Sequence, residues 1–145
     1  FAFTLYQLYV TQSLAQSMVE LSSNKWVVFI LINIFLLIAG FFLPPVAVIV
    51  MTSAILLPVI TTLGFDPYWF AIVFTINMEI GLITPPVGLN LYIIKGITPD
   101  VSLSEILKGS IPFMIIMALA ILILCIFPEI VTWLPDKIMG KDLGF

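Results

Sequence analysis

The residues best suited to chemistry are a pair of prolines that interrupts an apolar segment. The run GLITPPVG, residues 81–88, lies within the otherwise apolar stretch 68–94. Pro85 and Pro86 have no backbone N–H, and each ring crowds the carbonyl about four residues earlier. Carbonyl oxygens of the preceding turn, around residues 81–83, are therefore expected to lose their helical partners, and Thr84 adds a hydroxyl oxygen at the same level. Oxygens of this kind can bind a cation such as sodium.

Beyond the prolines, a new helix is expected to begin near residues 87–90. The free N–H groups at its start, and its positive dipole end, would suit an anion such as a carboxylate. Gly81 and Gly88 let another backbone or a ligand approach closely, and Asn90 lies in the first turn. Pro86, Gly88 and Asn90 are therefore the predicted contacts of an anionic solute. The alternative is a structural proline kink in a continuous helix.

A second apolar turn lies upstream, at residues 40–47 (GFFLPPVA). Residues 26–65 carry no charge, and as one helix they would be about 60 Å long, twice the roughly 30 Å of a hydrocarbon core. The chain must turn back near Gly40 and Pro44. Because non-helical backbone at membrane depth needs protein or a wet cavity around it, segment 26–63 is predicted to be a re-entrant helical hairpin. Two ordinary spans joined by an interfacial turn are the alternative.

The composition indicates a membrane protein. The chain is 62% hydrophobic and 9% charged, whereas soluble domains carry about 25% charged residues. Its net charge is −3 and it has no histidine, so neither a nucleic-acid partner nor ordinary haem or Ser-His chemistry is expected. Its single cysteine, Cys125, cannot form a zinc or iron–sulfur site alone. An all-α integral membrane protein that is not an enzyme is predicted. A membrane enzyme and a purely structural subunit are the alternatives.

The order of elements follows from the apolar runs and the breaks between them. The start at Phe1, inside an apolar stretch, indicates a fragment of a longer protein. A capping-box pattern, Ser102 to Glu105, predicts a helix start. The expected elements are a helix end and amphipathic arm at 1–23, the hairpin at 26–63, a broken helix at 67–95, a short amphipathic helix at 102–109, a last span at 111–128 and a polar tail at 129–145.

Two polar side chains lie inside the third apolar segment, just before the prolines. Glu79 could bind a cation, carry a proton, or pair with a lysine elsewhere, because an intramembrane acid suggests function. It could equally face a wet cavity or another subunit. Asn77 could orient the break by hydrogen bonds or join neighbouring helices.

These residues resemble a known family. The run NMEIGLITPPVGLN, residues 77–90, looks like the signature near the C-terminus of the large membrane subunit of TRAP transporters, the tripartite ATP-independent periplasmic transporters. The runs GFFL at 40–43, ILLP at 55–58, LGFDP at 63–67 and GSIPF at 109–113 also fit. The similarity covers nearly the whole chain, which would be the C-terminal part of a polytopic transport domain.

The resemblance implies an elevator-type fold of the ion-transporter superfamily, with two inverted halves of which this chain would end the second. It implies sodium-driven uptake of small carboxylates, such as C4-dicarboxylates and sialic acids, across the bacterial inner membrane. The implied partners are a small membrane subunit and a periplasmic binding protein; a sodium/carboxylate symporter without a binding protein is the alternative. Carried over by motif, one sodium site would join the hairpin tip to the break through Gly40, Phe41, Pro44, Gly81, Thr84 and Pro85.

One departure from the family pattern concerns the hairpin tip. Many members carry an acidic residue soon after the Gly-x-Phe of the tip, where this chain has Pro44 and Pro45. The tip is therefore expected to act through backbone groups. The number of lysines on each side does not decide the orientation of the chain in the membrane. The resemblance suggests that Lys95 and Lys108 lie on the cytoplasmic side.

Overall fold

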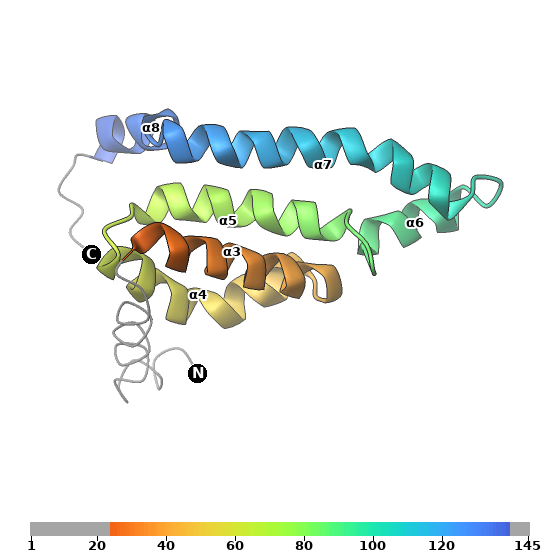
Figure 1. Ribbon diagram of the computed structural model, residues 1–145, viewed down its shortest axis with the longest axis horizontal. Helices are drawn as coiled ribbons and strands as arrows, with labels where there is room; N and C mark the ends of the chain where they lie inside the picture. The colour runs from red at the N-terminus through yellow and green to blue at the C-terminus, as the bar shows by residue number, and fades with distance from the viewer. Residues whose placement is uncertain (1–23, 140–145) are drawn as a thin grey trace.

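A computed structural model describes residues 24–139 as an assembly of helices, without a strand in that range. The arm expected at 1–23 and the end of the tail, 140–145, lie outside the described residues. Helices α3, α4, α5 and α7 lie side by side along the long axis of the molecule (Figure 1). The helices are α3 (Lys25–Phe42), α4 (Pro45–Thr62), α5 (Pro67–Leu82), α6 (Leu89–Ile97), α7 (Leu103–Ile126) and α8 (Glu129–Met139).

Helix α5 is the centre of the assembly, and it packs against each of the other five described helices. Its N-terminus is capped by Asp66, whose side chain accepts a hydrogen bond from the Trp69 amide at 2.9 Å. Its buried residues recur at spacings of three and four, which places them on a continuous stripe of the helix. They are Trp69, Phe70, Val73, Phe74, Asn77, Met78 and Gly81.

Helices α3 and α4 form a tight hairpin on one side of α5, joined through Leu43 and Pro44. The side chain of Asn24 caps α3 by accepting a hydrogen bond from the Trp26 amide at 3.0 Å. Pro45 opens α4, at a position where its missing N–H costs nothing. The two prolines of the tip thus end one helix and start the next, which fixes the hairpin bend beside α5.

The last apolar part of the chain differs from expectation. The short helix expected at 102–109 and the span expected at 111–128 form one helix, α7, with Pro112 inside it. A single proline removes one main-chain hydrogen bond, and here the affected carbonyl belongs to Lys108 at the exposed end of α7. The predicted capping box is confirmed, because the Ser102 hydroxyl and the Glu105 amide, and the Glu105 carboxylate and the Ser102 amide, are hydrogen-bonded.

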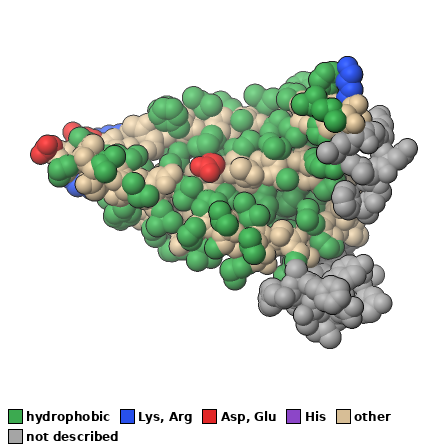
Figure 2. Space-filling model, turned by 180° about the vertical axis from the view of Figure 1, so that it is seen from behind, with side chains coloured by type: hydrophobic (Ala, Val, Ile, Leu, Met, Phe, Trp, Pro, Cys, Tyr) green, Lys and Arg blue, Asp and Glu red, His purple; other side chains and the backbone are tan. Residues whose placement is uncertain are grey.

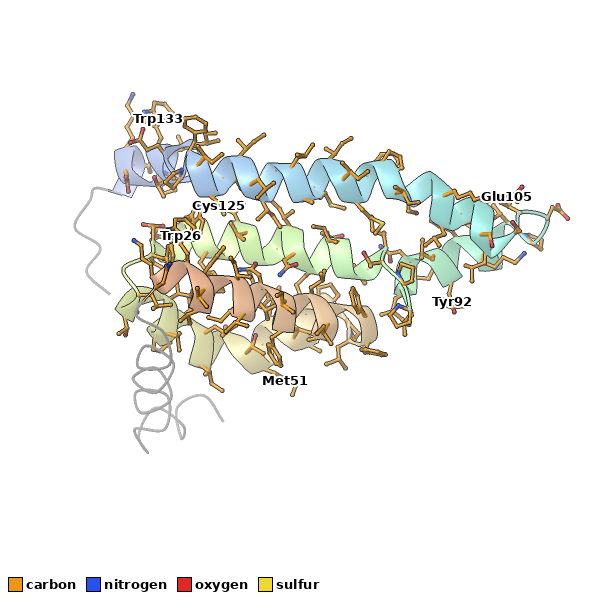
Figure 3. All side chains as sticks on the ribbon, in the orientation of Figure 1. Trp26, Met51, Tyr92, Glu105, Cys125 and Trp133 are labelled. Carbon is orange, nitrogen blue, oxygen red and sulfur yellow. The ribbon has the colours of Figure 1, made fainter. Side chains whose placement is uncertain are left out.

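The segment expected as a polar tail contains helix α8, which packs against α5 and α7. Apolar side chains at helical spacing, Ile130, Trp133 and Leu134, give this segment an apolar face that a polar tail lacks. The polar residues and the proline of the segment favour a tail, whereas this spacing favours a helix, and Figure 3 shows Trp133 on the side of α8 that faces away from α5.

The outer surface is apolar, as expected for a protein whose solvent is lipid. Figure 2 shows hydrophobic side chains over most of the visible face, with charged groups gathered towards the ends and one acidic group between them. Helices α3, α4 and α7 are each long and apolar enough to cross a membrane. Helix α7 buries only two of its side chains, Ile106 and Leu124. These features describe a multi-pass membrane protein.

An aromatic cluster joins the helices at the end of the bundle where α3 and α5 begin. Its four rings, with neighbouring centroids 5.1–5.9 Å apart, belong to Trp26, Phe29, Phe65 and Trp69. The indole N–H of Trp69 donates to the buried carbonyl of Leu124 on α7 at 2.7 Å. That carbonyl would normally accept from residue 128, which is a proline without an N–H. Trp69 therefore supplies the donor that α7 lacks.

We predict that Trp69→Phe lowers the free energy of unfolding by about 1–3 kcal/mol, because the Leu124 carbonyl is left buried without a donor. Thermal unfolding of the full-length protein in detergent measures this as a lower Tm. Trp133→Phe is the matched control, since Trp133 is exposed on α8 and should change the Tm little. Equal Tm values for the two variants would contradict the assigned role of the indole.

Candidate functional site: the hairpin tip and the broken helix

The third apolar segment is discontinuous. Helix α5 ends at Leu82 and α6 begins at Leu89, with a turn between them that contains a cis peptide bond between Pro85 and Pro86. Gly88 has a positive φ of 55° and stands at the start of α6, where its carbonyl accepts from the Leu91 amide at 2.8 Å. A continuous, merely kinked helix is thereby excluded for this segment.

The end of α5 leaves carbonyl oxygens open, that is, without a hydrogen-bond donor. Within residues 24–139, no hydrogen bond reaches the carbonyls of Leu82 and Ile83. The Gly81 carbonyl, expected to be open as well, accepts from the Thr84 amide at 3.3 Å because the chain tightens as α5 ends. The Thr84 hydroxyl donates to the carbonyl of Ile80, so the lone pairs of that hydroxyl remain available to a cation.

The start of α6 leaves amide groups open. No hydrogen bond within the described range uses the amides of Val87, Leu89 or Asn90 as donors, and no side chain caps this helix. These groups stand at the positive end of the helix dipole. The break therefore presents acceptors on its α5 side and donors on its α6 side.

The hairpin tip meets the break through two glycines. A Cβ atom on Gly81 would lie 2.8 Å from the carbonyl carbon and 2.9 Å from the Cα of Gly40, so only glycine permits this approach. Both glycines begin the same pattern, Gly-x-x-x-Pro-Pro, at residues 40–45 and 81–86. This shared spacing is a sequence signal that the analysis of single motifs missed.

The shared pattern also opens carbonyls at the tip. In a helix, the oxygens of Gly40 and Phe41 would accept from residues 44 and 45, and both of these are prolines. In the part of the chain that the structure describes, no hydrogen bond reaches either oxygen. The Gly40 oxygen lies 3.1 Å from the position of a Gly81 Cβ. The tip, with its open oxygens, thus touches the end of α5, where the Leu82 and Ile83 carbonyls are also open.

The other predicted residues lie in the hairpin tip, in the turn between α5 and α6, and in the first turn of α6. Gly88 is buried, and a Cβ there would lie 3.1 Å from the Thr84 carbonyl oxygen, so the turn closes on itself. Asn90 is half-buried in the first turn of α6, and its side chain makes no hydrogen bond to another described residue. Phe41 is half-buried, while the rings at the tip and in the turn are exposed, namely those of Pro44, Pro85 and Pro86.

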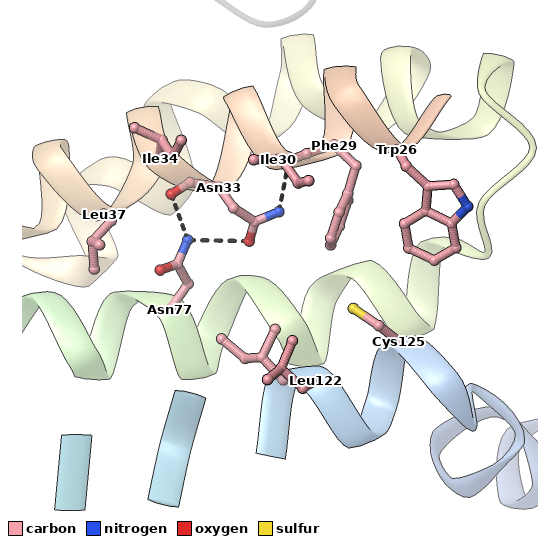
Figure 4. Close-up of a pocket in the computed structure, with 10 residues that line it drawn as sticks. Trp26, Phe29, Ile30, Asn33, Ile34, Leu37, Asn77, Leu122 and Cys125 are labelled. Atoms are coloured by element: carbon pink, nitrogen blue, oxygen red, sulfur yellow. Dashed lines mark hydrogen bonds between the residues drawn. The ribbon is translucent and has the colours of Figure 1, made fainter. Parts of the chain in front are cut away.

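A pair of asparagines holds the two parts of the site in register (Figure 4). Asn77 is only 4% exposed, and its side-chain amide donates to the main-chain oxygen of Asn33 at 2.8 Å and to the Asn33 side-chain oxygen at 3.2 Å. Asn33 in turn donates to the Phe29 carbonyl at 2.8 Å. Asn77 therefore joins helices, one of the two roles expected for it. Asn33 was not singled out from the sequence, although it is the one amide side chain in residues 26–51.

Glu79 is exposed on α5, and in residues 24–139 no lysine pairs with it. No three His, Cys, Asp or Glu side chains in the same range lie close enough to hold a metal. The break itself offers main-chain carbonyls and the Thr84 hydroxyl as oxygen ligands, and Asn90 adds a side-chain oxygen in the first turn of α6.

Comparison with known proteins gives the family of this chain. A family model described as "Tripartite ATP-independent periplasmic transporter, DctM component" matches residues 1–130. The chain belongs to this family. The resemblance found in the sequence is thereby confirmed, and so is the expectation that the chain belongs with transporters and not with enzymes.

Individual relatives agree with this assignment. The chain is 37% identical over 94% of its length to the C4-dicarboxylate TRAP transporter large permease protein DctM of Pseudomonas aeruginosa. It is 34% identical over 92% of its length to the DctM protein of Vibrio cholerae, and 36% identical over 83% to the isethionate TRAP transporter permease protein DctMQ of Oleidesulfovibrio alaskensis. The chain spans 32%, 29% and 19%, respectively, of the length of these relatives.

We predict that Gly81→Ala separates the hairpin tip from the break, because its Cβ cannot coexist with the Gly40 backbone. The free energy of unfolding should fall by about 1–3 kcal/mol, as in overpacked cores. Gly40→Ala should cost less, since a Cβ there would meet its nearest atom at 3.4 Å. Denaturant or thermal unfolding of the full-length protein measures both changes.

Gly96→Ala is the matched control for these variants. A Cβ on Gly96 meets no atom within 4 Å, and alanine favours a helix by up to about 1 kcal/mol over glycine. This variant should be neutral or slightly more stable. If Gly81→Ala and Gly40→Ala were equally mild, close contact between the two glycines could not be what holds the tip against the break.

Proposed function

We propose that this chain is part of the membrane permease subunit of a sodium-coupled, binding-protein-dependent secondary transporter that imports small carboxylates. The observation that carries the proposal is that open main-chain oxygens occur both at the hairpin tip and at the end of α5, two elements that touch at Gly40 and Gly81. Unpaired carbonyls are costly in a membrane, so their presence in two elements at one place favours a bound ion.

Sodium is the cation that fits the available groups. The oxygens are neutral carbonyls, with one hydroxyl from Thr84, and unwound backbone carbonyls with half-helix C-termini coordinate sodium in secondary transporters. Gly40, Phe41, Gly81, Thr84 and their neighbouring prolines would form this site. Sodium would be a transported ion and not a prosthetic group. The chain carries no acid at the tip, so the backbone groups would bind the ion.

A carboxylate is the solute that we assign to the α6 side of the break. The open amides before and within the first turn of α6 favour an anionic group, with Pro86, Gly88 and Asn90 beside it. The names of the relatives mention C4-dicarboxylates and isethionate, which share an anionic head group. Since two relatives of similar identity are named for C4-dicarboxylates, we propose a small dicarboxylate as the cargo.

We further propose that the hairpin is re-entrant, within an elevator-type fold. Helix α7 is about 36 Å long at 1.5 Å per residue and α3 is about 27 Å. The hairpin tip stops beside the break, short of the far loop between α6 and α7 (Figure 1). A tip at this level would lie inside a bilayer that α7 crosses. The protein would reside in the bacterial inner membrane, with a small membrane subunit and a periplasmic binding protein as partners.

A symporter without a binding protein and a purely structural subunit are the competing assignments. The words "tripartite" and "periplasmic" in the family description favour a binding-protein partner over the first. A purely structural subunit would not need open carbonyls on one side of the break and open amides on the other.

We predict that Thr84→Val, which removes the hydroxyl and keeps the shape, raises the sodium concentration for half-maximal uptake about tenfold, equivalent to about 1.4 kcal/mol. Sodium should also raise the Tm of the unaltered full-length permease, and raise that of the variant less. Uptake of a C4-dicarboxylate into proteoliposomes, with the binding protein present and sodium varied, measures the first effect.

Thr75→Val on the same helix is the control for Thr84→Val. Thr75 is exposed, and its hydroxyl donates to the Ala71 carbonyl at 2.8 Å, as that of Thr84 does to Ile80. It should leave the sodium dependence unchanged. If the unaltered permease, Thr84→Val and Thr75→Val showed the same sodium dependence of uptake, Thr84 would not belong to the ion site. Uptake that does not depend on sodium in the unaltered permease would reject the proposed coupling.

A further inference from the structure

An open apolar groove runs between α3 and α7, over α5. Both walls pack against α5, and a cavity of about 340 Å³ lies between them. One wall contains Ile30, Ile34 and Leu37, and the other contains Ile121, Leu122 and Cys125. Ile30, Ile34 and Leu37 recur at spacings of about one helical turn, as do Leu122 and Cys125, so each wall is a ridge along its helix. Ile30, Ile34 and Leu122 are each about half exposed.

One polar atom in this groove lacks a partner. The side-chain nitrogen of Asn77 is used by Asn33, whereas the side-chain oxygen of Asn77 accepts no hydrogen bond within residues 24–139. Figure 4 shows this oxygen on the side away from Asn33, in a groove lined mostly by apolar side chains. Asn77 is 96% buried, which follows from its exposed fraction of 4%. An unpaired buried acceptor costs about 1–3 kcal/mol, so an occupant with a donor is favoured.

A lipid chain and a lone water molecule both fit this groove poorly. An acyl chain has no donor and would leave the Asn77 oxygen unpaired. A buried water needs two to four polar partners, and the groove offers few, because its lining is mostly apolar and one N–H of the neighbouring Asn33 is bonded to the Phe29 carbonyl. The groove therefore needs an apolar surface that also carries one hydrogen-bond donor.

A transmembrane helix with a polar residue on one face has both properties. Such helices join through Ser, Thr, Asn or Gln side chains, and their side chains would interlock with the ridges of Ile34 and Leu122 on the two walls. A volume of about 340 Å³ accepts a few side chains and not a whole helix. The occupant would therefore lie over the groove and insert one face.

We propose that the groove between α3 and α7 is occupied by a transmembrane helix of the same polypeptide, outside these 145 residues, which donates a hydrogen bond to the Asn77 side-chain oxygen. The chain spans only 29–32% of the length of its C4-dicarboxylate relatives, so such a protein has more than enough further polypeptide for this helix. Through Asn77 and Asn33, the helix would brace α5 against α3 beside the Gly40–Gly81 contact.

Photo-crosslinking in the full-length permease tests this occupant. A benzophenone amino acid is placed at Ile34 and, in a second protein, at Leu122, and the products formed in native membranes are identified by mass spectrometry. Both positions should crosslink to the same peptide of the same polypeptide. Phe35 and Ile123 are the controls: they are exposed apolar neighbours of Ile34 and Leu122, turned about 100° around their helices and outside the groove lining, and they should not give that peptide.

Other products would overturn the proposal. Lipid adducts alone at Ile34 and Leu122 would identify an acyl chain as the occupant. A peptide from a differently tagged second copy or from another subunit would identify an intermolecular interface. Two unrelated peptides from the two walls would show that no single helix fills the groove.

A double-mutant cycle tests the hydrogen bond. The Ser, Thr, Asn or Gln of the crosslinked peptide is replaced by Ala, alone and together with Asn77→Leu, and the Tm of each full-length protein is measured. The Ala replacement should lower the Tm by several degrees when Asn77 is present and have little effect when it is absent. Equal losses in both backgrounds would reject the bond, and if Asn77→Leu does not fold, the crosslinking result still decides the occupant.

Discussion

The structure depends on the inability of proline to donate a main-chain hydrogen bond. Pro44 and Pro45 end α3, and Pro85 and Pro86 end α5, each pair leaving carbonyls without donors in the described chain. Lipid cannot pair with these groups. The two defects meet where Gly40 touches Gly81, so that groups which are costly when separate are gathered in one place, where a cation could satisfy them together.

The remaining helices keep that contact in place. Helix α5 touches every other described helix, and its buried stripe ends in Asn77, Met78 and Gly81. Asn77 bonds to α3 one turn before Gly81, while Trp69 ties the opposite end of α5 to α7. The contacts of Asn77 and Trp69 therefore fix α5 on one side of the break. The turn between α5 and α6 is held mainly by Thr84 and Gly88.

Two expectations from the sequence about helix ends differ from the structure. A break was expected between residues 109 and 111, yet α7 runs through it with Pro112 inside, because a single proline removes one hydrogen bond while the rest of the helix continues. Two adjacent prolines at 85–86 do end a helix. The Gly81 carbonyl was expected to be open and is paired with the Thr84 amide, since the chain tightens locally. The number of adjacent prolines thus decides whether a helix ends, and the local tightening of the chain decides which carbonyls at its end stay open.

The amino-acid sequence by itself determined that this is an apolar, helical chain with two proline turns, because hydrophobic content and the missing N–H of proline are properties of single residues. The family signature in residues 77–90 is likewise local. Only the tertiary structure decided that Gly40 meets Gly81, that Asn33 pairs with Asn77, and that an unpaired oxygen faces a groove. These contacts join residues about forty positions apart, and they depend on how α3 packs against α5, which no local pattern specifies.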